Sequence, residues 1–152
     1  MLTIEPYTGA VTDALWQLLL EADPDRAAVS RYLASGEIVI AYWEHAIVGV
    51  AVLTALDGEY ELRNISVAGS HQGRGIAKAL IAAVKARATS LGANRLLVGT
   101  GNSSLDQFAL YQKSGFRFER IERDYFAGYQ PPICENGIRC LDRICLYADL
   151  SQ

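Results

Sequence analysis

The chain has 152 residues and a net charge of −3 at neutral pH; 51% of its residues are hydrophobic and 20% are charged. It is long enough to bury a core and too apolar for intrinsic disorder, so we expect one packed soluble domain over residues 1–152. The acidic net charge argues against a general nucleic-acid binder. Its apolar runs are too short to cross a bilayer and its N-terminus lacks the pattern of a signal peptide. We therefore expect a cytoplasmic protein without a membrane partner.

The N-terminal region predicts one strand and two helices. Residues 2–6 alternate apolar and polar side chains, which is typical of a short strand. A helix is expected over about residues 13–21, and a second one, introduced by an Asp-Pro-Asp sequence, over about residues 24–35. We expect Gly36 to end the second helix in a left-handed conformation.

Three strands rich in Val, Ile and aromatic residues follow. Residues 37–43 and 46–53 flank the pair Glu44-His45, which predicts a tight hairpin turn. Residues 60–67 form the third strand, after a second turn at Asp57-Gly58.

The second half of the chain alternates helices and strands. We expect helix, strand, helix, strand, long loop and strand at residues 78–91, 95–99, 105–114, 116–123, 124–142 and 143–150. The order of elements predicts an α/β fold with a mixed central sheet of about seven strands and helices on both faces.

Three cysteines lie near the C-terminus, at Cys134, Cys140 and Cys145. Their number is odd, they do not form a Cys-x-x-Cys pair, and His45 and His71 are distant in sequence. This arrangement argues against a zinc site, and we expect no metal. Reduced thiols in the cytoplasm are the better interpretation.

A glycine-rich turn joins the strand over residues 60–67 to the next helix. It reads Gln72-Gly-Arg-Gly-Ile-Ala-Lys78. Unpaired backbone N–H groups at a helix start attract anions, and glycines let a bulky anion reach the backbone, so the turn predicts a phosphate site. The P-loop pattern Gly-x-x-x-x-Gly-Lys-Ser/Thr is absent. Lys78 also fills the slot where a dinucleotide-binding turn needs a third glycine or an alanine.

The pattern Gln/Arg-x-x-Gly-x-Gly/Ala fits this turn at Gln72, Gly75 and Ala77. It resembles the pyrophosphate loop of the GNAT superfamily of acyl-CoA-dependent N-acetyltransferases. A second motif of that family, Leu-Tyr-x-x-x-Gly-Phe, is matched over residues 110–116. By element order the resemblance covers roughly residues 1–123. It implies a single-domain GNAT-like fold and acetyl transfer from acetyl-CoA to a primary amine, directly within a ternary complex.

The resemblance also implies the residues that bind the cofactor, acetyl-CoA or coenzyme A. Many family members carry an Asn seven residues before the motif Tyr; here that slot is Ser104, with Asn102 nearby, and either side chain is a candidate. The expected cofactor-binding residues are Ile65, Ser66, Val67, Gln72, Gly73, Arg74, Gly75, Ile76, Ala77, Asn102, Ser104 and Tyr111.

The strand over residues 60–67 changes its apolar phase partway along. Apolar side chains before Arg63 fall on one face by period-two counting, and those after Asn64 fall on the other. A bulge of one extra residue would restore a common face. In the GNAT fold such a bulge helps to separate this strand from its parallel neighbour, here residues 95–99, and the gap takes the pantetheine arm. The alternative is a regular strand with Asn64 on a solvated face.

Two side chains are candidates for catalysis. By resemblance, Tyr111 would donate a proton to the departing thiolate, although a packing role on an amphipathic helix is the alternative. Glu61 is the candidate base, with Glu59 as runner-up, and a solvated strand carboxylate is the alternative for both. A backbone N–H near Ser66 and Val67 would stabilise the oxyanion.

The 124–142 loop is long for a compact domain, which is typical of functional loops. Its aromatic residues, in particular Tyr125 and Phe126, are expected to form one wall of the substrate site and to select the acceptor. We also expect nearby carboxylates to attract a cationic amine; these are Glu119, Glu122, Asp124 and Glu135. A dimer contact or a solvated linker is the alternative, and the apolar last strand is a candidate for pairing across a homodimer.

Two other function classes compete with the enzyme. One is a non-catalytic acyl-CoA-binding or sensing domain, against which the presence of both Tyr111 and Glu61 argues. The other is a nucleotide-binding module, which the missing third glycine argues against. The acceptor, a small-molecule amine or a protein amine, is not specified by any residue.

Overall fold

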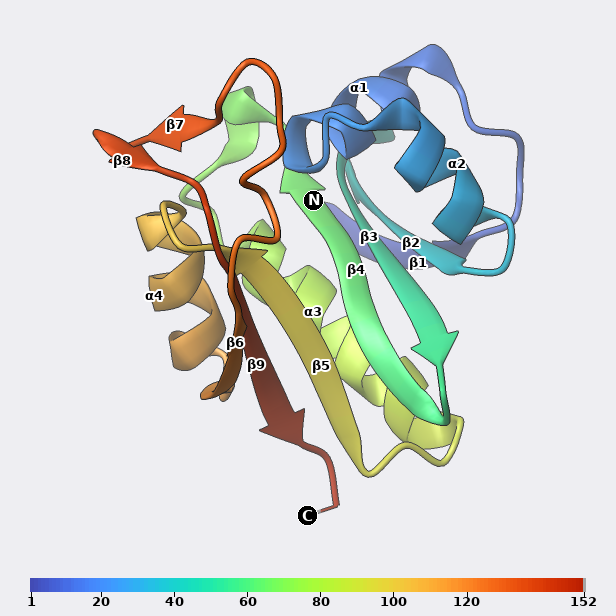
Figure 1. Cartoon of the computed structure of the whole chain (residues 1–152). Coiled ribbons are helices and arrows are strands. Elements are labelled where there is room, and N and C mark those ends of the chain that lie inside the picture. The colour runs from blue at the N-terminus through green and yellow to red at the C-terminus, as the bar shows by residue number, and fades with distance from the viewer. Residues whose placement is uncertain (152) are drawn as a thin grey trace.

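The computed structural model, which describes residues 1–151 apart from the side chain of Leu56, is built on one seven-stranded sheet. In spatial order the strands are β1 (Leu2–Tyr7), β2 (Glu37–Trp43), β3 (Ala46–Leu56), β4 (Glu59–Val67), β5 (Arg95–Gly101), β9 (Arg143–Asp149) and β6 (Arg117–Glu122). Only β4 and β5 pair in parallel (Figure 1). The predicted mixed α/β sheet is therefore confirmed.

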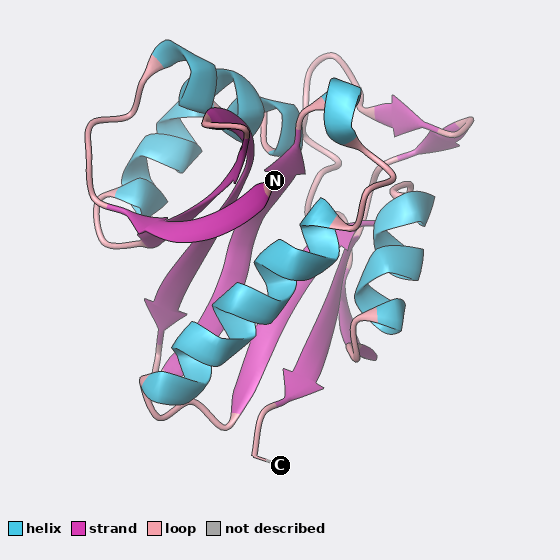
Figure 2. Ribbon diagram, turned by 180° about the vertical axis from the view of Figure 1, so that it is seen from behind, coloured by secondary structure: helices cyan, strands magenta, loops and turns pink. Residues whose placement is uncertain are grey.

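Helices cover the two faces of this sheet. The helices α1 (Asp13–Ala22) and α2 (Arg26–Leu33) lie on one face, over β2 and β3. On the opposite face α3 (Ile76–Ser90) runs across the sheet, and α4 (Leu105–Lys113) lies beside it (Figure 2). The 124–142 loop, expected to be irregular, contains a small hairpin of β7 (Cys134–Glu135) and β8 (Ile138–Arg139). Among the described residues, no helix combines the length and apolar character needed to cross a membrane.

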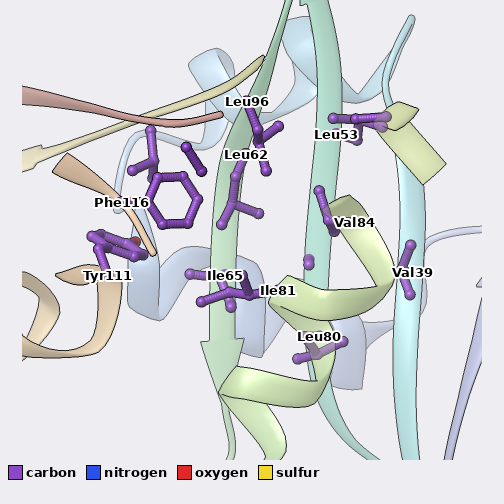
Figure 3. Packing of buried hydrophobic residues seen from close by; sticks show 14 of the residues in the cluster. Val39, Leu53, Leu62, Ile65, Leu80, Ile81, Val84, Leu96, Tyr111 and Phe116 are labelled. Carbon is purple, nitrogen blue, oxygen red and sulfur yellow. The ribbon is translucent and has the colours of Figure 1, made fainter. Parts of the chain in front are cut away.

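The larger hydrophobic core lies between α3 and the sheet. Figure 3 shows the α3 side chains Leu80, Ile81 and Val84 directed at the strands, with Tyr111 and Phe116 closing one end of the cluster. Burial of each such side chain contributes roughly 1.5–3 kcal/mol. A second cluster joins α1 and α2 to the other face. The two cores fix the helices whose ends border the site described below.

Local signals explain most boundaries. The side chain of Thr12 accepts from the Leu15 N–H at 3.3 Å and caps α1, and that of Asp25 accepts from the Ala28 N–H at 3.1 Å and caps α2. The predicted hairpin turn at Glu44-His45 is confirmed, since both residues have positive φ, 49° and 71°.

Two boundary predictions were wrong. The helix α3 starts at Ile76 rather than Lys78, because Gly75 itself is the left-handed N-cap. Gly36 does not adopt the expected left-handed conformation. Close packing is the reason for a glycine there, because a β-carbon would lie 2.8 Å from the Tyr32 carbonyl oxygen and 3.0 Å from a Val52 methyl carbon.

The predicted bulge in β4 is present. Val52 pairs with Asn64 and Leu53 pairs with Leu62, which leaves Arg63 as the extra residue. Asn64 does not lie on a solvated face: it is 4% exposed, and its side-chain amide donates to the Leu19 carbonyl at 3.0 Å. The alternative of a solvated Asn64 is therefore excluded, because the bulge turns this side chain toward α1.

Beyond the bulge, β4 and β5 separate. Their parallel pairing covers residues 60–62 and 96–98 alone, and the strands diverge toward the end of the sheet bordered by α1 and the 124–142 loop (Figure 1). The last strand, β9, lies between β5 and β6 and pairs on both sides. It therefore has no free edge, and the expectation that it could pair across a homodimer was wrong.

Candidate functional site

A cavity of about 1180 Å³ opens where β4 and β5 diverge. Its walls come from the bulged half of β4, the end of β5, the start of α3, one side of α4, the α1–α2 corner and the 124–142 loop. Elements that are distant in sequence therefore meet at one hollow, and the broken pairing between two strands creates it.

The glycine-rich turn forms one end of this cavity. Gly73 and Gly75 have φ of 77° and 78°, and a β-carbon on either would meet no atom within 4 Å. No side chain caps the N-terminus of α3, so its first N–H groups have no side-chain acceptor. Gln72, Ile76 and Ala77 line the cavity beside them. This end of the cavity is suited to an anion such as a phosphate.

The two basic residues near this turn, Arg74 and Lys78, differ in their position relative to the cavity. Lys78 lines the cavity. The Arg74 side chain is exposed and its guanidinium carbon lies 5.1 Å from the centre of the Trp43 ring, outside the residues that line the cavity. Only the backbone of Arg74 therefore contributes to the turn. Its side chain stacks on the Trp43 ring instead.

The bulged half of β4 supplies a second wall. Ile65, Ser66 and Val67 all line the cavity, and each pairs with β3 on the other side. Because β5 has already diverged, the backbone groups on the β5 side of these residues have no strand partner. An extended ligand could pair with such an edge as an added strand does.

Tyr111 lies where the core meets the cavity. It is 4% exposed and packs edge-on against Phe116, with ring centroids 5.6 Å apart. It also lines the cavity, and no side-chain hydrogen bond among residues 1–151 involves its hydroxyl. Burial raises the pKa of the phenol above its usual range, so Tyr111 keeps its proton at neutral pH.

Glu61 is a buried carboxylate on the cavity wall. It is 8% exposed and accepts from Arg63 Nη1 at 3.2 Å and from Arg143 Nη2. The runner-up, Glu59, lies outside the cavity lining and pairs with Arg95 at 3.0 Å. The two glutamates that the sequence left as alternatives therefore differ clearly in position.

Arg143 is a site residue that the sequence analysis missed. From β9 its guanidinium contacts Glu61 on β4 and donates to Glu122 Oε1 on β6 at 2.6 Å. To reach Glu61 it crosses β5 above Gly99, where a β-carbon would overlap the guanidinium. Glu61 and Arg143 are separated by 82 residues, so no local pattern indicates the pair.

The structure separates the two candidates for the cofactor contact. Ser104 lines the cavity and donates to Glu135 Oε1 at 2.9 Å. The Asn102 side chain is bound to the backbone of residues 139–142 and does not line the cavity. Asn102 therefore faces the 124–142 loop, and no local pattern indicates this contact because it depends on the loop path.

The 124–142 loop brings its aromatic residues to the cavity. Tyr125, Phe126 and Tyr129 all line it, and their rings pack edge-on in sequence, with centroids 4.8 Å and 5.7 Å apart. The loop thus contributes a continuous aromatic wall to the cavity that the α1–α2 corner also lines.

The carboxylates that line the cavity are mostly different from those expected. Glu119 pairs with Arg95, Glu122 with Arg143, and neither lines the cavity; Asp124 does not line it either. Glu135 does line it, but accepts from two serine hydroxyls. The α1–α2 corner instead supplies three carboxylates that sequence reasoning missed: Glu21, Asp23 and Asp25. Within the part of the chain that the structure describes, no group of three His, Cys, Asp or Glu side chains is arranged to hold a metal ion.

Known proteins resemble this chain in sequence and in structure. An uncharacterized N-acetyltransferase of Bacillus subtilis strain 168, named YvbK, is 43% identical over 140 residues, which cover 91% of this chain and 90% of that protein. A GNAT family acetyltransferase from Elizabethkingia anophelis, solved with acetyl-CoA bound, is 42% identical with a TM-score of 0.91 and covers 97% of both chains.

A Bacillus subtilis acetyltransferase, solved in complex with CoA, is 41% identical with a TM-score of 0.93; the match covers 98% of this chain and 99% of that one. Residues 6–116 match the family described as the acetyltransferase (GNAT) family. That match spans most of the chain and includes the glycine-rich turn and Tyr111. The protein therefore belongs to the GNAT family of acetyltransferases.

Proposed function

We propose that this protein is an acetyl-CoA-dependent N-acetyltransferase that moves an acetyl group to a primary amine by direct transfer in a ternary complex. One observation carries the proposal: the phosphate-type turn, the unpaired edge of β4 and the Tyr111 hydroxyl all border one cavity. Anion site, extended groove and proton donor are the three features that a coenzyme A thioester needs from its enzyme.

The residues present fit such a cofactor. The N–H groups at the start of α3 would hold the pyrophosphate, and the β4 edge at residues 65–67 would pair with the pantetheine arm. Ser104 lies on the cavity wall near Tyr111 in sequence and supplies a hydroxyl. Two relatives at 42% and 41% identity, solved with acetyl-CoA and CoA, support the assignment.

Tyr111 is the proposed acid. In acetyl transfer the amine nitrogen bonds to the thioester carbon, the carbon–sulfur bond breaks, and the sulfur leaves as a thiolate. A free phenol, with a reference pKa of about 10, would protonate a thiolate whose conjugate acid has a pKa of about 8.5 in a slightly uphill step. Burial raises the pKa of Tyr111, so the same transfer is more uphill from the buried phenol than from a free one. No side-chain hydrogen bond among the described residues competes for the buried, protonated Tyr111 hydroxyl, which supports this role.

Glu61 is the proposed acceptor of the amine proton, directly or through water. Its place on the cavity wall supports this role over that of Glu59. The guanidinium groups of Arg143 and Arg63 hold its carboxylate in one orientation. The N–H groups near Ser66 and Val67 are the proposed donors to the oxyanion.

The acceptor is proposed to be a cationic amine, on a small molecule or a protein. Three carboxylates of the α1–α2 corner line the same cavity as the aromatic wall of the 124–142 loop, and this combination favours an ammonium group. Three free cysteines suit a reducing cytoplasm.

A turnover screen tests the function. Purified protein is incubated with acetyl-CoA and a panel of polyamines, aminoglycosides, amino acids and peptides, and released CoA thiol is measured. Acetylation of at least one amine class is expected. Tight CoA binding without turnover of any amine would instead support the alternative of a non-catalytic acyl-CoA-binding domain.

A further inference from the structure

Asn102 holds the 124–142 loop at the point where the loop rejoins the sheet. Its Nδ2 donates to the Arg139 carbonyl at 3.1 Å, and its Oδ1 accepts from the N–H groups of Leu141 at 2.8 Å and Asp142 at 2.9 Å. The Asn102 N–H also donates to the Asp142 carbonyl at 3.0 Å. Three side-chain bonds and one backbone bond therefore connect one residue to this end of the loop.

Leu141 extends this connection to the aromatic wall. The Phe126 N–H donates to the Leu141 carbonyl at 2.8 Å. The Phe126 ring in turn lies between the rings of Tyr125 and Tyr129. The backbone of Leu141 thus binds Asn102 through its N–H and Phe126 through its carbonyl, so a shift at Leu141 would move the centre of the wall.

The end of β5 packs tightly against the same part of the loop. A β-carbon on Gly101 would overlap Cys140 Sγ and lie 3.7 Å from a Phe126 ring carbon. Cys140 is 4% exposed, and its N–H donates to the Ile133 carbonyl at 2.7 Å. The thiol is therefore covered only while the loop stays seated on Gly101 and Asn102.

We propose that Asn102 is a positioning residue for the acceptor side of the cavity, which acts on Phe126 through Leu141. Its Oδ1 already accepts two hydrogen bonds, and its side chain lies off the cavity, so this role differs from the cofactor contact expected from the sequence. The effect on catalysis rests on the proposed function, whereas the effect on the loop does not.

The loop effect can be measured without any substrate, by the rate at which iodoacetamide alkylates each cysteine, resolved by mass spectrometry. Asn102→Ala should speed alkylation of Cys140 about 10- to 1000-fold, because three hydrogen bonds no longer oppose opening of the loop. Asn102→Asp should restore part of the protection, since its carboxylate still accepts from Leu141 and Asp142 but cannot donate to the Arg139 carbonyl. Cys145, 4% exposed within β9, reports any global unfolding.

Asn136→Gly is the matched control, because glycine tolerates the left-handed φ of 57° at this position. Asn136 Nδ2 donates to the Ser103 carbonyl at 2.9 Å, so this change removes a side-chain hydrogen bond to the same turn without touching Leu141. Its Cys140 rate should stay at the wild-type level. A wild-type Cys140 rate in Asn102→Ala, or an equal rise at Cys145, would overturn the proposal.

The effect on catalysis is measured with the amine that is acetylated most efficiently in the turnover screen. Asn102→Ala should raise the acceptor KM at least about tenfold and leave the acetyl-CoA KM within about twofold, and Asn102→Asp should recover part of the acceptor KM. An unchanged acceptor KM in a variant whose Cys140 is exposed would also overturn the proposal. If the wild type neither binds CoA nor turns over any amine, the proposed function fails, and the alkylation rates still decide the role of Asn102.

Discussion

The Arg143 guanidinium occupies the space above Gly99 that any larger residue at position 99 would fill. This relationship lets one arginine cross β5 and join Glu61 on β4 to Glu122 on β6. Both Glu61 and Arg143 have largely buried side chains, 10% and 14% exposed. A glycine in the middle of a strand is thus explained by the passage of a charged side chain over it.

Replacing Gly99 by Ala should separate Arg143 from Glu61. We expect the free energy of unfolding, measured by urea denaturation, to fall by about 1–3 kcal/mol, the usual cost of overpacking. If Glu61 takes the amine proton, kcat should fall on the order of 100-fold because the carboxylate loses its orientation. Gly69→Ala is the control, since a β-carbon there meets no atom within 4 Å. Wild-type kcat in Gly99→Ala would remove Glu61 and Arg143 from the mechanism.

Gly75→Glu should abolish CoA binding measured by calorimetry. The new side chain would place a negative charge at the start of α3, where the pyrophosphate is expected. Gly92→Glu is a matched control, because Gly92 lies just past the other end of the same helix with a similar φ of 89° and equally open space. The two variants share the backbone strain, so a similar loss of CoA affinity in both would refute the phosphate site.

Tyr111→Phe keeps the ring and its packing on Phe116 but removes the proton. Turnover should fall roughly 10- to 10,000-fold, the range for a lost acid–base group, while the CoA dissociation constant changes less than about twofold. Because burial raises the pKa of Tyr111, the wild type should show no loss of activity from this group as the pH rises to about 10. Unchanged turnover in the variant, with chemistry rate-limiting, would leave Tyr111 only its packing role.

Tyr125→Ala and Phe126→Ala should raise the acceptor KM and leave the acetyl-CoA KM nearly constant, because both rings line the part of the cavity proposed to hold the acceptor. The measurement is a pair of saturation curves for each variant, with sedimentation to follow the oligomeric state. A change in oligomeric state alone, with unaltered acceptor kinetics, would favour the rival role of the 124–142 loop as a dimer contact.

Features that depend on neighbouring residues were predictable from the sequence. The turn at Glu44-His45, the bulge at Arg63 and the open turn around Gly75 each follow from the conformational preferences or phase of a few adjacent residues. The element order was predictable for the same reason, since helices and strands have local periods.

Features that depend on contacts between distant parts of the chain could not be predicted from the sequence. Arg143 looks like an ordinary polar residue of an alternating strand until β9 is placed beside β5. The carboxylates of the α1–α2 corner read as capping residues, and Asp25 is one, yet the fold also turns them toward the cavity. Asn102 was a candidate for the cofactor contact because it is the Asn near the expected slot, which Ser104 fills, and the path of the 124–142 loop brings its side chain to Leu141 and Asp142.

The divergence of β4 and β5 also bears on aggregation. An unpaired strand edge on the outside of a sheet invites pairing with another chain. Here the free edge at residues 65–67 faces inward, toward a strand of the same sheet and between the helices of its two faces. A foreign polypeptide strand carries side chains on both of its faces, which would collide with those helices, whereas the pantetheine arm carries only small substituents. If the edge binds the arm as proposed, its inward position also hinders pairing with strands of other chains.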